Sequence, residues 1–69
     1  MRKIDFLKRT AGRYIGVTYT RYGKTKNAAG KVLDLNSKRV LLEDSWGNNH
    51  YVPTNNIIVV RHNREEVRF

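Results

Sequence analysis

The stretch between Arg21 and Ala29 has the residue types and spacing needed to bind a nucleic-acid strand. Three cationic side chains, Arg21, Lys24 and Lys26, stand beside one aromatic ring, Tyr22. Cations neutralise phosphates, and an exposed ring can stack on a base for about 1 to 3 kcal/mol. The alternative is a solvated hairpin tip with an incidental tyrosine. The nucleic-acid-binding residues that we predict from this stretch and from the hairpin after it are Arg21, Tyr22, Lys24, Lys26, Lys31, Lys38 and Arg39.

The other candidates for chemistry do not form a catalytic or metal site. Neither His50 nor His62 has another ligand at metal spacing, and His50 is expected to be a surface residue of a strand. A solvated rim or ion pairs explain the acids Asp34, Glu43 and Asp44. We therefore expect no enzyme activity, no catalytic residue, no metal and no cofactor.

Charge indicates the kind of partner. The chain has 14 Lys and Arg against 6 Asp and Glu, a net charge of +8. Residues 1–39 hold eleven of the basic and two of the acidic side chains, so the excess lies in the first half. A basic face of this kind favours nucleic acid, because each neutralised phosphate releases a counterion. RNA is slightly favoured over DNA, and the alternative is a surface that only improves solubility.

Length and composition predict one small domain. A chain of 69 residues buries little surface, and without cysteine it must depend on β-packing or on oligomerisation for stability. The absence of cysteine fits a cytoplasmic location. No apolar run approaches the roughly 18 residues of a membrane span, so no membrane partner is expected.

The pattern along the chain changes from helical to strand periodicity at Gly12. Residues 1–11 are predicted to form a short amphipathic helix that ends at Gly12. Ile15, Val17 and Tyr19 then alternate as in a strand over Arg13 to Thr20, and Gly16 within it suggests a bend or a close backbone approach. Residues 12–61 are expected to form a barrel, and residues 62–69 a tail, a short helix or an extra strand.

The stretch from Gly30 to Asp44 reads as two strands joined by a turn at residues 36–38. Both strands carry apolar residues at consecutive positions, as in Val32-Leu33 and Val40-Leu41-Leu42. A strand with one face in water would alternate apolar and polar residues. We therefore expect both arms to be buried on two faces, in a strongly bent sheet or by a partner.

The last third of the chain adds a tight turn and two strands. Trp46 lies in the turn and is interpreted as a rim residue over the barrel end, with a stacking platform or interface anchor as the alternative. A short strand then ends at Pro53, which cannot donate to a ladder. The run Ile57, Ile58, Val59 and Val60 reads as a strand buried on both faces, and it is the oligomer interface that we predict.

This order of elements resembles the Sm-like proteins, which include the bacterial Hfq proteins. Gly12 followed by alternating Ile15, Val17 and Tyr19 stands at the spacing of the first Sm signature, and Gly30 with Val32 opens the next strand in the same way. The stretch Val40 to Asp44 is similar to the third strand and its acidic pair, and Tyr51 to Val60 is similar to the second signature. The resemblance covers about residues 6–60 and implies a small RNA-binding barrel.

The residues that bind uridine in that family are not matched. Asn36 and Arg39 stand where the family has Asp and Asn, and Pro53-Thr54 stands where it has Arg-Gly. The Lys-His pair of Hfq is also missing. SH3-like barrels that bind duplex DNA therefore remain an alternative.

Together these patterns predict an all-β protein, a small SH3-like or Sm-like barrel of about five antiparallel strands with a short N-terminal helix. The function that we predict is nucleic-acid binding, mainly through phosphate contacts, with aromatic stacking. The alternative is a protein–protein interaction or assembly subunit whose positive charge is incidental, and we expect the chain to form a homo-oligomer.

Overall fold

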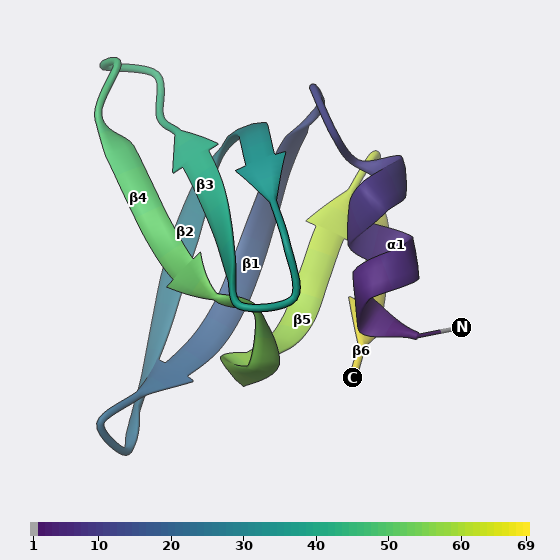
Figure 1. Ribbon diagram of the computed structural model, residues 1–69, viewed down its shortest axis with the longest axis vertical. Helices are drawn as coiled ribbons and strands as arrows, with labels where there is room; N and C mark the ends of the chain where they lie inside the picture. Colours follow the sequence, from purple (N-terminus) through teal and green to yellow (C-terminus); the bar gives the residue numbers. More distant parts are fainter. Residues whose placement is uncertain (1) are drawn as a thin grey trace.

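The computed structural model describes residues 2–69 as one antiparallel sheet with a short helix against it. Helix α1 is followed by strands β1 to β6, with one turn of 3₁₀ helix, η1, between β4 and β5 (Figure 1). The sheet order is β4-β3-β2-β1-β5-β6. The bounds are Lys3–Arg9 (α1), Tyr14–Arg21 (β1), Lys24–Leu35 (β2), Arg39–Glu43 (β3), Asn49–Pro53 (β4), Thr54–Asn56 (η1), Ile57–His62 (β5) and Glu65–Arg68 (β6).

The predicted class, mostly antiparallel β with one short helix at the start, is confirmed, but the strand count differs. The sheet has six strands and is open, with β4 and β6 at its two margins. The sixth strand comes from residues 62–69, which contain too few apolar residues for their pattern to predict a strand. It forms because Asn63 and Arg64 adopt positive φ, 51° and 68°, the geometry of a tight hairpin turn.

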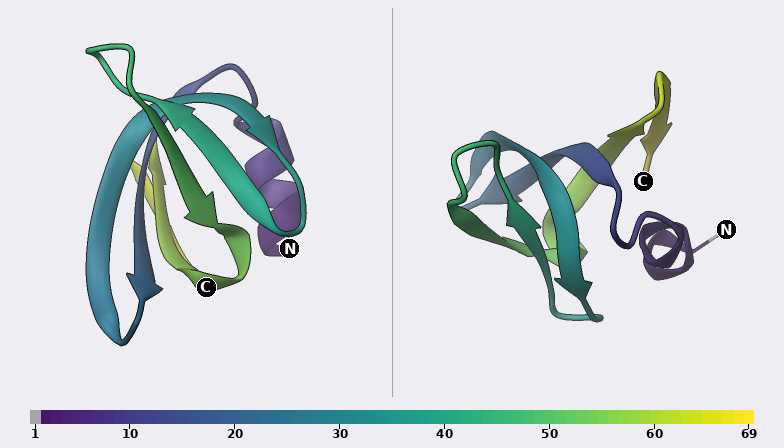
Figure 2. Two further views of the ribbon diagram at one scale, coloured as in Figure 1. Left: turned by 60° about the vertical axis from the view of Figure 1, so that its left-hand side comes forward. Right: turned by 90° about the horizontal axis from the view of Figure 1, so that it is seen from above.

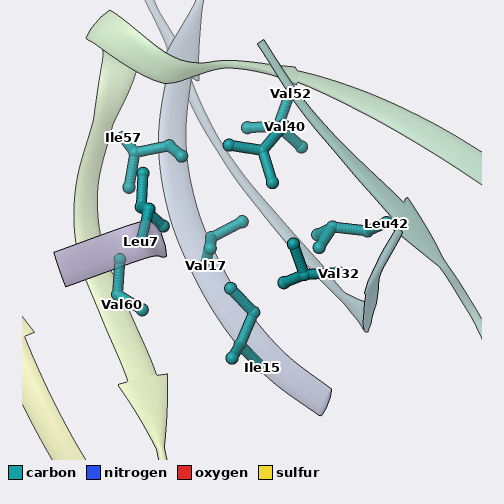
Figure 3. Packing of buried hydrophobic residues seen from close by; sticks show 9 residues of the cluster. All are labelled: Leu7, Ile15, Val17, Val32, Val40, Leu42, Val52, Ile57 and Val60. Atoms are coloured by element: carbon teal, nitrogen blue, oxygen red, sulfur yellow. The ribbon is translucent and has the colours of Figure 1, made fainter. Parts of the chain in front are cut away.

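The core lies on one face of the curled sheet and is closed by the helix. Figure 3 shows Leu7 of α1 beside Ile57 and Val60 of β5, which places the helix over the β5 side of the cluster. Each side chain of the cluster is at most 2% exposed. Its members are Leu7, Ile15, Val17, Val32, Val40, Leu42, Val52, Ile57 and Val60.

The long strand β2 curls the sheet because its two halves pair with different strands. Residues 24–31 pair with β1, whereas the pairing with β3 begins at Lys31 and continues to Leu35. Gly30 lies at this change of partner, and a Cβ added there would lie 2.6 Å from the carbonyl oxygen of Glu43. The close backbone approach expected at Gly16 is therefore at Gly30 instead, since an added Cβ at Gly16 has its nearest neighbour at 4.0 Å.

The hairpin predicted between Gly30 and Asp44 is confirmed, but the expectation that both of its faces are buried is wrong. Asn36 forms the turn by accepting the backbone N–H groups of Lys38 (2.8 Å) and Arg39 (3.0 Å). The register shifts between Val32 and Asp34, which inserts Leu33 as an extra residue. Leu33 is 45% exposed. A β-bulge, and not a second packed layer, explains the consecutive apolar residues Val32 and Leu33. In β3 only Val40 and Leu42 are buried, and Leu41, between them, is half-buried.

The aliphatic run of β5 is covered by the chain itself. Ile57, Val59 and Val60 are at most 4% exposed, and only Ile58 of the run, at 38%, reaches solvent. Both edges of β5 are paired, with β1 on one side and β6 on the other. The inference that this run needs a partner therefore loses its basis, and an oligomer interface at residues 57–60 stays a prediction.

The contact at Gly30 gives a test of the fold. Gly30→Ala places a methyl group against the backbone of Glu43, which cannot move without disturbing the β2–β3 pairing. We expect a loss of about 1 to 3 kcal/mol in the free energy of unfolding, the usual effect of overpacking. The control is Gly16→Ala, where the added methyl group is in ordinary contact. Urea unfolding monitored by circular dichroism measures both variants, and equal stabilities would contradict the close approach.

Candidate nucleic-acid interface

The hairpin that joins β1 to β2 presents the predicted aromatic residue at its tip. Arg21 pairs with Lys24, so only Tyr22 and Gly23 form the turn. Both have positive φ, 52° and 75°, as a type I′ turn requires. Glycine adopts this conformation freely, whereas a tyrosine there loses about 1 to 2 kcal/mol. The Tyr22 side chain is 95% exposed, so no packing offsets that strain.

The 3₁₀ turn η1 brings other segments to the same end of the sheet. The side-chain amide of Asn56 donates to the carbonyl oxygen of Thr20 at 2.8 Å, next to the hairpin that carries Tyr22. The backbone N–H of Thr54 donates to the carbonyl oxygen of Lys38 at 3.0 Å, and its hydroxyl donates to that of Asn36 at 2.9 Å. η1 therefore joins the β1–β2 hairpin to the β2–β3 turn.

The start of helix α1 completes this surface. Lys3 donates to the carbonyl oxygen of Asn55 in η1 at 3.2 Å, and burial there lowers the pKa of its ammonium. A pocket of about 240 Å³ connects the helix start to η1 and to the β2–β3 turn. We call this surface the basic end. Its cationic residues are Arg2, Lys3, Arg21, Lys24, Lys26 and Lys38.

Acidic residues are mostly elsewhere. Glu43 and Asp44 lie at the end of β3, and Glu65 and Glu66 lie at the start of β6. Figure 1 places both of these segments at the opposite end of the sheet from the β1–β2 tip. At the helix start Asp5 forms an ion pair with Arg2 at 2.9 Å, and Asp34 lies in β2 shortly before the β2–β3 turn. Among residues 2–69, none of the four ion pairs involves Arg21, Lys24, Lys26 or Lys38.

Two predicted residues do not join the basic end. Lys31 pairs with Tyr14 and Glu43, seven residues along β2 from Lys24, or about 23 Å at the usual rise of a strand. Arg39 lies over the ring of Tyr51, with its guanidinium carbon 4.7 Å from the ring centroid. Sequence reasoning missed this contact, because it depends on the register between β3 and β4. Arg2 and Lys3, which were not among the predicted residues, join the basic end because the start of α1 lies next to η1.

Trp46 is not the rim residue that we favoured. It lies in the turn between β3 and β4 and is 85% exposed, so it covers no part of the core. Asp44 builds this turn, because its Oδ1 accepts the N–H groups of Trp46 and Asn48, both at 2.9 Å. Its Oδ2 lies 2.7 Å from Nε2 of His50. His50 is thus an exposed strand residue that supports the turn.

The hydrogen bonds to the Asp44 carboxylate predict that stability depends on pH. The hydrogen bond to His50, followed by those from the backbone of Asn48 and Trp46, lowers the pKa of this carboxyl group. A lowered pKa stabilises the fold above the pKa of the unfolded chain, about 4, and this contribution disappears as the pH falls through the folded value. We expect Asp44→Asn to be less stable than the original chain at pH 7, with the difference shrinking below pH 4. Urea unfolding between pH 7 and pH 2 measures it, and a difference that does not change with pH would rule out the charge as the cause.

Residues 2–69 contain no group of three or more His, Cys, Asp or Glu placed to hold a metal ion. In the same part of the chain no helix is long and apolar enough to cross a membrane.

Comparison with known proteins adds no family. The chain matches no family model, no curated protein and no solved structure.

Proposed function

We propose that the protein is a nucleic-acid-binding module that contacts phosphates through the basic end and stacks one base on Tyr22. The observation that carries this proposal is the β1–β2 tip. A tyrosine that is 95% exposed is held in a left-handed conformation between two cations, Arg21 and Lys24. Strained residues without packing partners are typical of functional sites.

The arrangement of charge supports contacts with a polyanion. The basic end contains six cationic residues, and five of them have no ion-pair partner among residues 2–69. When these cations neutralise phosphates, the nucleic acid releases counterions, and this adds affinity that does not depend on base sequence. The ring of Tyr22 adds further affinity for single-stranded nucleic acid, because only an unpaired base leaves its face free to stack.

Weak sequence preference follows from the β2–β3 turn. Asn36 and Arg39 stand where Sm-like proteins hold uridine. Here the Asn36 side chain is occupied by two backbone N–H groups, and Arg39 lies over Tyr51. Because the Asn36 oxygen is already engaged and Arg39 contacts an aromatic ring, the proposal rests on phosphates and stacking.

An Sm-like or SH3-like barrel is the fold family that we propose. The order of a helix, a strand, a long bent strand, two short strands, a 3₁₀ turn and an aliphatic strand supports it. The sixth strand and the open margins of the sheet are differences from the simple five-stranded form. RNA is the nucleic acid that this resemblance favours.

The proposal is tested by charge removal at matched sites. Lys24→Ala with Lys26→Ala should weaken binding to all sequences and make the slope of log K against log salt shallower by roughly one to two units. Arg13→Ala with Lys31→Ala removes the same charge from the opposite end of the β1–β2 hairpin and should change the slope less. Fluorescence anisotropy with single-stranded and duplex RNA and DNA at several salt concentrations measures both.

Two results would contradict the proposal. If both double variants lose the same affinity, binding follows total charge and not the basic end. If the intact chain binds none of the four nucleic acids at low salt, the proposed function is wrong.

A further inference from the structure

Strand β4 lies at the edge of the sheet and lacks the charged residues that usually prevent an edge strand from pairing with another chain. Its residues are Asn49, His50, Tyr51, Val52 and Pro53, with no Lys, Arg, Asp or Glu among them. The opposite margin, β6, contains Glu65, Glu66 and Arg68. The half of β2 that pairs only with β1 contains Lys24 and Lys26. Charged residues on an exposed edge strand oppose pairing with another chain. The uncharged edge of β4 is therefore the one suited to such pairing.

The backbone groups that point out from β4 follow from the turn before it. The N–H of Asp44 donates to the carbonyl oxygen of Asn48 at 2.9 Å, which makes Asn48 face β3. Antiparallel pairs alternate, so His50 and Val52 also face β3. The backbone groups of Asn49 and Tyr51 therefore face outward, and Pro53, the N-cap of η1, ends this edge. Proline is tolerated there because its missing N–H would have pointed to solvent.

We propose that two copies of this chain form a dimer by antiparallel pairing of β4 with β4, with Tyr51 on the twofold axis. In that register the two Tyr51 residues exchange two backbone hydrogen bonds. The edge is thus complementary to itself, as an interface with twofold symmetry must be.

The side chains next to this edge are of the kind that fills interfaces. Tyr51 is 50% exposed, and the guanidinium group of Arg39 lies over its ring. Beside it on the outer face lie Leu41, which pairs with Tyr51, and Leu33, which is 45% exposed. Trp46, in the turn next to Asn49, would lie near the carboxyl end of the partner's β4. Tyrosine and tryptophan are enriched among residues that dominate binding energy.

Charge also permits this dimer. Two chains of +8 repel each other, but antiparallel pairing of β4 sends the two basic ends to opposite ends of the dimer. Two acids, Glu43 at the end of β3 and Asp44 in the turn that follows, lie next to this edge. Salt screens the remaining repulsion. Dimerisation should therefore strengthen with salt, whereas nucleic-acid binding should weaken, and the dimer does not depend on the proposed function.

The first test is the molar mass in solution. Sedimentation velocity from low to high micromolar concentration in 0.5 M salt should show twice the 8.1 kDa of one chain. Tyr51→Lys places like charges opposite each other and should weaken the dimer by about tenfold or more. Ile58→Lys adds the same charge to an exposed site on β5 and should leave the dimer intact. Circular dichroism confirms that both variants fold.

The second test fixes the register and does not need a disruptive variant. The chain has no cysteine, so Tyr51→Cys introduces one thiol at the twofold axis. Opposed Cα atoms about 5.5 Å apart allow a disulfide, and mild oxidation should give a covalent dimer. Tyr22→Cys, at the far more exposed hairpin tip, should stay largely monomeric. The inference is overturned if the chain is 8.1 kDa at all concentrations, if only Ile58→Lys disrupts assembly, or if both cysteine variants cross-link equally.

Discussion

The contact between Gly30 and the backbone of Glu43 determines the shape of the sheet. A side chain at residue 30 would collide with that backbone, so only glycine lets β2 pass so close to the end of β3. The close approach allows one strand to pair first with β1 and then with β3. The curl that results brings Val32 and Leu42 over Ile15 and Val17, and helix α1 then has a concave apolar face to cover. A flat sheet of the same strands would leave this face open to water. Two further views show the curled strands and the helix against one side of them (Figure 2).

The same curl determines which charges meet. The β1–β2 tip and the β2–β3 turn both lie at one end of the sheet because β2 reverses direction in space between them. η1 then joins these segments through Asn56 and Thr54, and Lys3 attaches the start of the helix to η1. Residues far apart in sequence thus form one cationic surface, while Lys31, at the bend itself, is held away from it.

Local turn chemistry was readable from the sequence. The turn at Asn36 and the end of β4 at Pro53 were predicted, because each depends on the preferences of a few adjacent residues. The helix, predicted over residues 1–11 with its end at Gly12, spans only Lys3–Arg9. The parts that failed depend on long-range geometry. Leu33 was expected to be buried, but a bulge turns it outward, and Trp46 was expected to cover the core, but its turn extends past the sheet. β6 contains one half-buried apolar residue, Val67, and forms through its turn and its pairing with β5. The separation of Lys31 from Arg21 and Lys38 needed the bend of β2.

The central claim is that the basic end binds nucleic acid, and an NMR titration tests it most directly. A uniformly ¹⁵N-labelled chain would be titrated at low salt with a short single-stranded RNA, and the shifts of its backbone amides followed. The account predicts the largest changes at residues 20–26, at residues 54–56 and near Lys3 and Lys38. Changes confined to β6 or to the β3–β4 turn, or no changes at all, would contradict it.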